Sequence, residues 1–343
     1  MAIMPPFGNQ FIHQKKEEGR NTRLSPSLHL LQLSTMMFID PPKCLELGLT
    51  FVQISAAEQS LMSAAAKLHE FRSFYGSTPL DIAEMWYDLK HHGILTEKDI
   101  SMTGFKKYMV AHYYLYSYPR NATQTKRIFK ACKDYVTGKH LWGMIANIAS
   151  LLPHRIYWDE SLGDPDKSVF VASVDCTDCA IWEKRHHHHT NMDTSLYTKK
   201  KQSAGLKYEI VLSITSAKCM SVGGPYKPSI GDLDVFRKST KTKMLAMPGK
   251  KIIADSGYRA KEGTHPEEIG MFSLPNPLDD VELKRFKSRV RARHESFNGR
   301  LKCFRILDDK FHGVDLEKHG FAFKAVSVIV QYQMDNGSAI FDA

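Results

Sequence analysis

The chain has 343 residues, which is long enough for two domains with apolar cores of their own. Its formal net charge of +10 favours a polyanionic partner such as nucleic acid, although a protein held on a membrane surface can share that balance. No apolar run approaches the roughly 20 residues of a spanning helix, and residues 1–14 lack the charged start and long apolar stretch of a secretory signal. We therefore expect an intracellular protein with no membrane segment.

The first part of the chain is predicted to be helical after a polar tail. Residues 1–25 include a stretch rich in Lys, Glu, Arg and Asn, which is expected to be disordered. Residues 26–160 are expected to form a helical domain. Thr78 and Pro79 suit the N-cap and the first position of a helix. The apolar residues on one face of this helix are Ile82, Met85, Trp86 and Leu89.

A basic pair of helices is the candidate for contact with DNA. The pattern predicts helices over 122–129 and 139–151, joined by a turn near 131–135, in the outline of a helix-turn-helix. An ordinary helical hairpin is an equally good interpretation of this pattern. If the segment does contact DNA, its candidate DNA-binding residues are Lys126, Arg127 and Lys130.

After Pro153 the pattern changes to short strands and then long helices, which predicts an α/β domain over residues 161–343. Helices are expected over 232–239, 279–301 and 316–334. The result is a mixed sheet with flanking helices, and ligands of such sheets gather where strands end. The predicted strands are 169–174, 180–182, 208–215, 219–222, 251–254 and 271–274.

Three acidic residues are the best candidates for a catalytic site. Asp175 and Asp255 each end an apolar, strand-like run, and Glu295 lies inside a strongly basic helix. Carboxylates that converge from distant elements can hold two divalent metals for chemistry on a phosphodiester. Each aspartate alone has a plainer interpretation, because such residues often cap a helix or start a turn.

The helix around Glu295 combines one carboxylate with many cations. Between positions 284 and 305 it carries nine Lys or Arg, and Glu295 is its single acid. At about 100° per residue, Arg291, Glu295 and Lys302 lie within roughly 40° of one another, so one face presents a carboxylate between two cations. That layout suits a metal-binding glutamate with phosphate-binding neighbours. A solvated basic face is the usual alternative for such a run.

Two other patterns resemble metal sites. Cys176 and Cys179 have the spacing of half a zinc knuckle, but an offset of three on a strand places them on opposite faces, and the chain has no second pair. By the same parity, Asp175 and Asp178 do not share a face. Four histidines at 186–189 are more simply a solvated turn. The six cysteines are expected to be reduced thiols.

Six short motifs follow one another along the second half of the chain. They are Val174-Asp175-Cys176-Thr177-Asp178, Tyr197-Thr198-Lys199-Lys200, Gly205-Leu206-Lys207-Tyr208-Glu209, Gly223-Gly224-Pro225-Tyr226 with Asp232-Leu233, Ala254-Asp255-Ser256-Gly257-Tyr258-Arg259, and Arg291-x-x-x-Glu295-x-x-Asn298-x-Arg300-Leu301-Lys302. In this order and spacing the chain resembles the DDE transposases of the PIF/Harbinger-like endonuclease group, over roughly residues 70 to 335. Cys176 stands where that group usually has Gly, and Ser288 stands where a related bacterial branch has Tyr.

The resemblance implies an RNase H-like fold for residues 161–343 and a metal-binding triad of Asp175, Asp255 and Glu295. It also implies Mg²⁺, with Mn²⁺ as the alternative, and double-stranded DNA that is cut and joined. A separate DNA-binding partner protein, a homodimer, and a nuclear location in a eukaryotic source are further expectations. The candidate phosphate contacts, for which surface solubility is the alternative role, are Arg291, Arg300, Lys302, Lys199 and Lys200.

Two other functions fit the same sequence. A transposase-derived protein that binds DNA without cutting it would act through its helical domain, and the intact triad argues against this function. A nuclease of the RNase H type, acting on RNA or hybrid duplexes, would share the metals and the fold.

Overall fold

The structure is a computed structural model, and it describes residues 38–131, 138–166, 168–182, 194–198, 200–259, 265–313 and 315–340. The tail predicted at 1–25 and the histidines at 186–189 lie outside these ranges. Residues 38–343 form one compact unit, so the change from helices to strands near residue 160 falls inside that unit. Among the helices of the described ranges, none combines the length and apolar character that a bilayer crossing requires.

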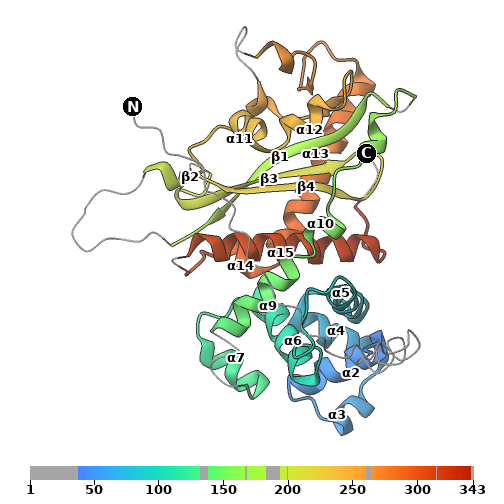
Figure 1. Ribbon diagram of the computed structural model, residues 1–343, viewed down its shortest axis with the longest axis vertical. Helices are drawn as coiled ribbons and strands as arrows, with labels where there is room; N and C mark the ends of the chain where they lie inside the picture. The colour runs from blue at the N-terminus through green and yellow to red at the C-terminus, as the bar shows by residue number, and fades with distance from the viewer. Residues whose placement is uncertain are drawn as a thin grey trace, which may run out of the picture. The chain divides into compact units, whose positions relative to one another are not determined.

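Between residue 38 and the sheet, the described residues are mainly helical, as predicted, while residues 26–37 of the predicted helical domain lie outside the described ranges (Figure 1). Thr78 caps its helix in a reciprocal arrangement: its hydroxyl accepts the N–H of Asp81, and the Asp81 carboxylate accepts the N–H of Thr78 at 2.8 Å. The predicted apolar stripe on this helix is buried, which confirms its role in the core. The helices are α2 (Pro41–Phe51), α3 (Ala56–Leu61), α4 (Ala64–Tyr75), α5 (Pro79–His91), α6 (Met102–Ser117), α7 (Ala122–Phe129), α9 (Lys139–Ala149) and α10 (Leu152–Arg155).

The two helices of the helix-turn-helix candidate are present as α7 and α9, whereas residues 132–137 between them lie outside the described ranges. α9 packs against α6 and against the long helix α15 (Leu316–Asp335). It buries Leu141, Met144, Ile145 and Ile148 in these contacts. A recognition helix needs a free face to enter the major groove. The opposite side of α9 exposes Lys139, His140 and Gly143, so a helix-turn-helix and an ordinary helical hairpin both remain interpretations of this segment.

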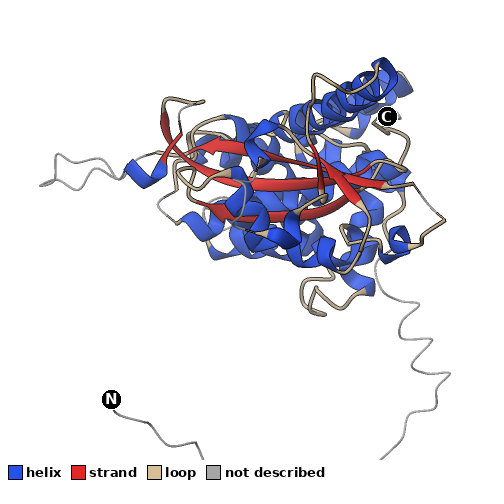
Figure 2. Cartoon of the chain, turned by 90° about the horizontal axis from the view of Figure 1, so that it is seen from above, coloured by secondary structure: helices blue, strands red, loops and turns tan. Residues whose placement is uncertain are grey.

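The sheet contains both antiparallel and parallel pairs (Figure 2). β3 lies at its centre with β1 antiparallel on one edge, and β4 and β2 antiparallel on the other. β5 and β6 continue from β1 as parallel neighbours. The predicted meander and mixed sheet are thus confirmed. The described strands are β1 (Phe170–Ala180), β2 (Tyr197–Thr198), β3 (Ser203–Ser213), β4 (Cys219–Tyr226), β5 (Lys251–Ile253) and β6 (Phe272–Ser273).

The prediction of two separate strands at 169–174 and 180–182 is wrong, because β1 runs without a break through Ala180. β3 stays paired with β1 over residues 172–180, which keeps Asp175, Thr177 and Asp178 inside the strand in spite of their polarity. The sequence suggested that Asp175 ends a strand, but it lies inside β1. Asp255 does follow the end of β5, as predicted. The short strand β2 was not predicted.

Helices cover both faces of the sheet (Figure 1). α11 (Asp232–Ser239) and α12 (Lys241–Leu245) lie on one face, where Phe236 packs in a common core with Val174 and Cys176 of β1. α13 (Val281–Lys302) and α15 cover the other face, where Tyr208 of β3 stacks on Phe323 with ring centroids 3.7 Å apart. α11 and α15 begin at the predicted residues. Shorter elements are α14 (Arg305–Asp308) and the 3₁₀ helices η1 (Glu160–Gly163), η2 (Thr194–Leu196), η3 (Ser256–Tyr258) and η4 (Pro266–Glu268).

α15 connects the helical part to the sheet. It packs on β4 and also on α5, α9 and α10. A charged network fixes this contact: Arg155 Nε donates to the Asp88 carboxylate at 3.1 Å, the Tyr332 hydroxyl donates to the same carboxylate, and the Arg155 guanidinium lies 4.2 Å from the centroid of the Tyr332 ring. Removing one member of a partly buried network leaves the others unpaired. The helical part is therefore held to the sheet by specific contacts.

Candidate active site

Asp175 and Asp255 occupy matching positions on neighbouring parallel strands. Ser173 of β1 lies opposite Ile253 of β5, and each aspartate follows two residues later. β5 ends at Ile253, so no described strand covers the edge of β1 at Asp175. The Asp255 side chain caps η3, where its Oδ1 accepts the backbone N–H of Gly257 at 2.8 Å. The end of β5 thus opens a space beside two carboxylates.

Glu295 reaches the same space from α13, which packs on β1. A cavity of about 200 Å³ is lined by all three acidic residues. Side chains from α13 and from the segment after β2 complete its wall. The structure therefore brings together three carboxylates from a strand, a strand end and a helix, as the sequence predicted. The other polar residues that line this cavity are Lys200, Arg291, His294 and Ser173.

The carboxyl of Asp175 has a strongly raised pKa. Burial raises the pKa of its carboxyl from the ordinary value of 3.8 to about 6. The charge of Lys200 lowers this pKa, and the charge of Asp255 raises it. The backbone N–H of Cys176 donates to its Oδ1 at 2.9 Å. A carboxyl with a raised pKa lies where the protein's own cations do not compensate the negative charge, and a divalent cation would do so.

Two of the predicted phosphate contacts lie at the cavity. Arg291 is exposed one turn before Glu295 on α13, and Lys200 is exposed near the end of the segment that precedes β3. Lys199 lies outside the described ranges. A phosphate that enters the cavity would thus meet two cations and three carboxylates.

The remaining predicted contacts lie elsewhere. Lys302 is about two turns beyond Glu295, near the buried thiol of Cys179. Arg300 donates to the backbone carbonyls of Ser338 and Ala339, the latter at 3.1 Å. Its guanidinium therefore joins α13 to the segment that follows α15. The three DNA contacts predicted in the helical part are exposed on α7 and at its C-cap, and they do not line the cavity. They are Lys126, Arg127 and Lys130.

The comparison with protein families agrees with this geometry. Residues 174–331 match the model of the DDE superfamily endonucleases. The matched segment starts one residue before Asp175 and contains Asp255 and Glu295. No curated protein and no solved structure matches the chain. Residues 174–331 are hence a DDE endonuclease-like segment.

Two groups of this DDE endonuclease-like segment were given no role in the site by the sequence analysis, although Lys207 and Asp232 stand in its motifs. Lys207 of β3 is buried and donates to Asp232 Oδ1 at 2.7 Å, and Asp232 is close enough to raise the pKa of Asp175 further, after burial and Asp255. His294 lines the cavity, and burial lowers its pKa to about 4, which keeps the ring neutral at pH 7. Lys207 and Glu209 interrupt the apolar run of β3, and that interruption was the signal that could have indicated a polar site.

Gly257 lies between two of these carboxylates. A Cβ atom at this position would be 2.9 Å from Asp255 Oδ1 and 3.0 Å from Asp232 Oδ2. These distances are shorter than a carbon and an oxygen normally approach. The tight turn predicted after Asp255 is present, and it requires glycine because the carboxylates are so close.

The two cysteines of β1 do not form a metal site. The Cys176 thiol lies 3.3 Å from the Tyr258 hydroxyl, within the core on the α11 face. Cys179 is also a buried free thiol, and it lies near Lys302 of α13. The parity argument is confirmed by these separate surroundings. It also holds for the neighbouring acids, because Asp178 accepts the Thr198 hydroxyl at 2.8 Å and does not line the cavity.

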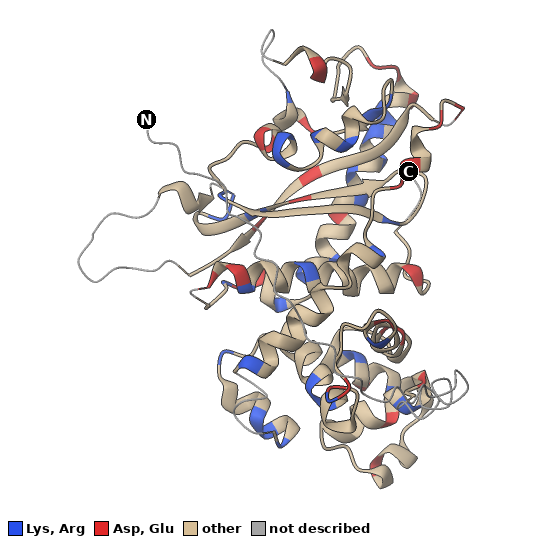
Figure 3. Cartoon of the chain, viewed as in Figure 1, with Lys and Arg blue, Asp and Glu red and all other residues tan. Residues whose placement is uncertain are grey.

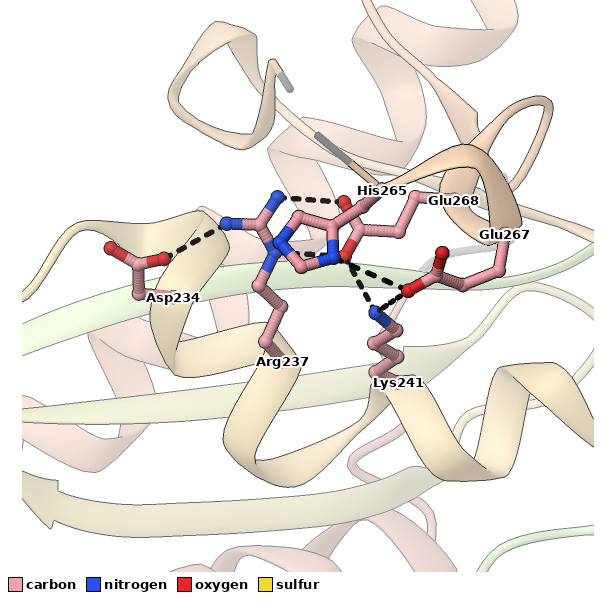
Figure 4. Close-up of polar contacts among 6 residues, drawn as sticks. All are labelled: Asp234, Arg237, Lys241, His265, Glu267 and Glu268. Carbon is pink, nitrogen blue, oxygen red and sulfur yellow. Dashed lines mark hydrogen bonds and ion pairs between the residues drawn. The ribbon is translucent and has the colours of Figure 1, made fainter. Parts of the chain in front are cut away.

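A compact acidic group elsewhere offers a contrast (Figure 4). Among the described residues, His265, Glu267 and Glu268 are the group whose candidate ligand atoms all lie within 4.8 Å of one another. Arg237 donates to both oxygens of Glu268, at 2.8 and 2.9 Å, and Lys241 pairs with both glutamates. The protein itself matches these charges, so the group is an ion-pair network that joins η4 to α11 and α12. Asp175, Asp255 and Glu295 are more widely spread and less neutralised, and their hard oxygen atoms fit divalent metals such as Mg²⁺.

Proposed function

We propose that the chain is a metal-dependent DNA endonuclease and strand transferase of the PIF/Harbinger-like DDE type, with an RNase H-like catalytic fold. The observation that carries this proposal is that Asp175, Asp255 and Glu295 line one cavity together with Arg291 and Lys200. The match of residues 174–331 to the DDE superfamily endonucleases supports the same chemistry.

In this proposal Asp175, Asp255 and Glu295 hold divalent metal ions, Mg²⁺ or Mn²⁺. Ions held by these carboxylates would supply activation of a water or a 3′-hydroxyl as nucleophile and stabilisation of the charge on the leaving oxygen. One oxygen of each aspartate is held by a backbone N–H, that of Cys176 or Gly257, which fixes the side chains and leaves the other oxygen available. Arg291 and Lys200 position a phosphate without reading base sequence.

The substrate and partners follow from the same proposal. Double-stranded DNA is the proposed substrate, in keeping with the net charge of +10. A separate DNA-binding protein would supply sequence recognition, as the resemblance to the PIF/Harbinger-like transposases implies. The proposal also includes a homodimer and, in a eukaryotic source, a nuclear location.

The test compares cleavage of labelled duplex DNA, duplex RNA and hybrid duplex with Mg²⁺, with Mn²⁺ and with a chelator. A pool of duplexes with randomised sequence, read by sequencing the new ends, removes the need to know the target beforehand. We expect metal-dependent cuts in duplex DNA that disappear in the Asp255→Asn variant. Binding of DNA without any cut would favour a transposase-derived binding protein. Preferential cutting of RNA or of the hybrid would favour an RNase H type of nuclease.

A further inference from the structure

A second cavity lies beside the proposed active site. Its volume is about 500 Å³, and Arg291 lines both cavities. Arg259, four residues after Asp255, forms another part of its wall, and Lys284 and Ser288 contribute from α13. At about 100° per residue, positions 284, 288, 291 and 295 fall within roughly 60° on the helix surface. The two cavities therefore follow one stripe of α13, from Glu295 back toward the start of the helix.

The charge of the second cavity is strongly positive. Its single lining carboxylate, Asp279, is already paired with Lys287 at 2.7 Å, and the Lys287 ammonium also donates to the carbonyl of Leu274. Within the described ranges, the guanidinium groups of Arg259 and Arg291 have no carboxylate partner. Lys284 donates to the exposed carbonyl of Pro277 at 2.7 Å, and Asp279 is bonded to Lys287 rather than to Lys284. Figure 3 shows how Lys and Arg recur along α13.

The position of Lys284 argues against a role in helix stability. α13 begins at Val281, so Lys284 stands near the N-terminal end, where the helix dipole disfavours a positive charge. Lys287 is held by Asp279, whereas Arg259 and Arg291 have no carboxylate partner among the described residues. An anionic ligand would account for three cations gathered at one cavity.

We propose that this second cavity binds the phosphates of the DNA strand that flank the one held at the triad, with Arg259 and Lys284 as the contacting residues. Lys284 and Glu295 are eleven residues apart, about 16 Å along a helix, which is the length of a few nucleotides of one strand. The strand would then run along α13, and Arg291 would contact the phosphate between the two cavities. The inference rests on the proposed function, because it takes the triad as the place of the scissile phosphate.

The experiment measures DNA affinity against salt concentration in the presence of a chelator, so that cleavage plays no part. Lys284→Gln is compared with Arg285→Gln, because the two residues are neighbours on α13 and Arg285 does not line either cavity. Loss of one phosphate contact reduces the slope of log affinity against log salt by about 0.9. We expect this loss for Lys284→Gln and for Arg259→Gln, and an unchanged slope for Arg285→Gln. Circular dichroism confirms that each variant keeps its helices.

Equal slopes for the Lys284 and Arg285 variants would overturn the inference, because the charge would then act as a diffuse basic face. The outcome is independent of the cleavage test. If the chain never cuts DNA but Lys284→Gln selectively reduces the slope, the cavity is a DNA site and the proposed function is wrong. If the chain cuts DNA and the slopes stay equal, the proposed function stands without this cavity.

Discussion

Asp175 and Asp255 lie side by side because Ser173 of β1 is in register with Ile253 of β5. The sheet therefore places two of the three carboxylates, and the packing of α13 on β1 places Glu295. None of the three side chains belongs to the apolar core, since Asp175 and Asp255 are partly exposed and Glu295 is exposed. Substitutions at these positions should alter the chemistry and leave the fold intact.

Glu295→Gln tests the role of the helix carboxylate. The change removes one negative charge from the cavity and keeps the size of the side chain and the basic residues of α13. We expect cleavage to fall by more than about 100-fold, because even residues behind metal ligands cost 10- to 100-fold when they are changed. DNA affinity measured with a chelator should change little. The matched control is Glu282→Gln, an exposed glutamate of the same helix outside the cavity, which should keep full cleavage. Equal activity of both variants would remove Glu295 from the site.

Asp175→Asn tests, through the free energy of unfolding, whether the ionised carboxyl of Asp175 destabilises the folded chain. The folded-state pKa of about 6 lies above the ordinary 3.8, so folding favours the protonated carboxyl. Below about pH 4 the carboxyl is protonated in both states, and stability is lost as the pH rises through 6. Without metal at pH 7.5, Asp175→Asn should therefore be more stable than the parent chain, by up to about 3 kcal/mol for a shift of roughly two pKa units.

Urea unfolding with a chelator, at pH 7.5 and near pH 4, measures this difference. The advantage of Asp175→Asn should vanish at the lower pH. Addition of Mg²⁺ or Mn²⁺ should stabilise the parent chain and not the variant, since a ligand stabilises only the state that binds it. A variant that is less stable than the parent at both values of pH would show that the ionised carboxyl is not under strain in the cavity.

Gly257→Ala tests the close approach of Asp255 and Asp232. The added Cβ would lie within 3.0 Å of both carboxylates, so at least one of them must move. We expect cleavage to fall at least about tenfold, because small displacements of positioned groups are costly, with little loss of far-ultraviolet circular dichroism. Gly299→Ala on α13 is the control: nothing lies within 4 Å of its Cβ position, and the change should stabilise the helix by about 1 kcal/mol without loss of cleavage. A similar effect of both substitutions on cleavage would contradict this account.

Local sequence signals predicted most of the elements that position the site. Thr78 with Asp81 sets the start of α5, and the apolar run at 251–254 sets β5 and the turn at Asp255. These features depend on residues close in sequence, so propensity and periodicity are sufficient. The order of the motifs then indicated which carboxylates meet.

The features that were not predicted depend on contacts between distant residues. β1 continues through Asp175 and Asp178 because β3 pairs with it, which no local pattern of these polar residues reveals. The basic run of α13 likewise contains both buried, hydrogen-bonded cations and exposed ones. Arg293 is buried and donates to the carbonyls of Ile214 and Ser216, whereas Arg291, two residues earlier, is exposed at the cavity. Sequence alone cannot separate structural from free cations, because the acceptors are backbone carbonyls of a remote turn.

The basic residues of α7 offer a last test, of recognition outside the catalytic cavity. The side chains of Lys126, Arg127 and Lys130 are exposed. Gln53 Nε2 caps the C-terminal end of α7 by donating to the backbone carbonyls of Arg127 and Ile128. Substitution of all three cations by Gln removes charge while the helix and its cap remain. The full chain must be used, because α5 and α9 pack on α15 and would lose that contact in a fragment.

We expect the triple Gln variant to bind duplex DNA more weakly in chelator, with the salt slope reduced by up to about 2.7 if all three residues contact phosphates. The control carries three Gln substitutions at Lys67, Arg72 and Lys98, cations of the same helical part that give the same change in net charge. If α7 contacts DNA, the control should keep nearly the parent slope. Equal slopes in the two variants would show that only net charge matters there, and α7 would then be a packing element whose cations serve solubility. DNA contacts would in that case be confined to α13 and the catalytic cavity.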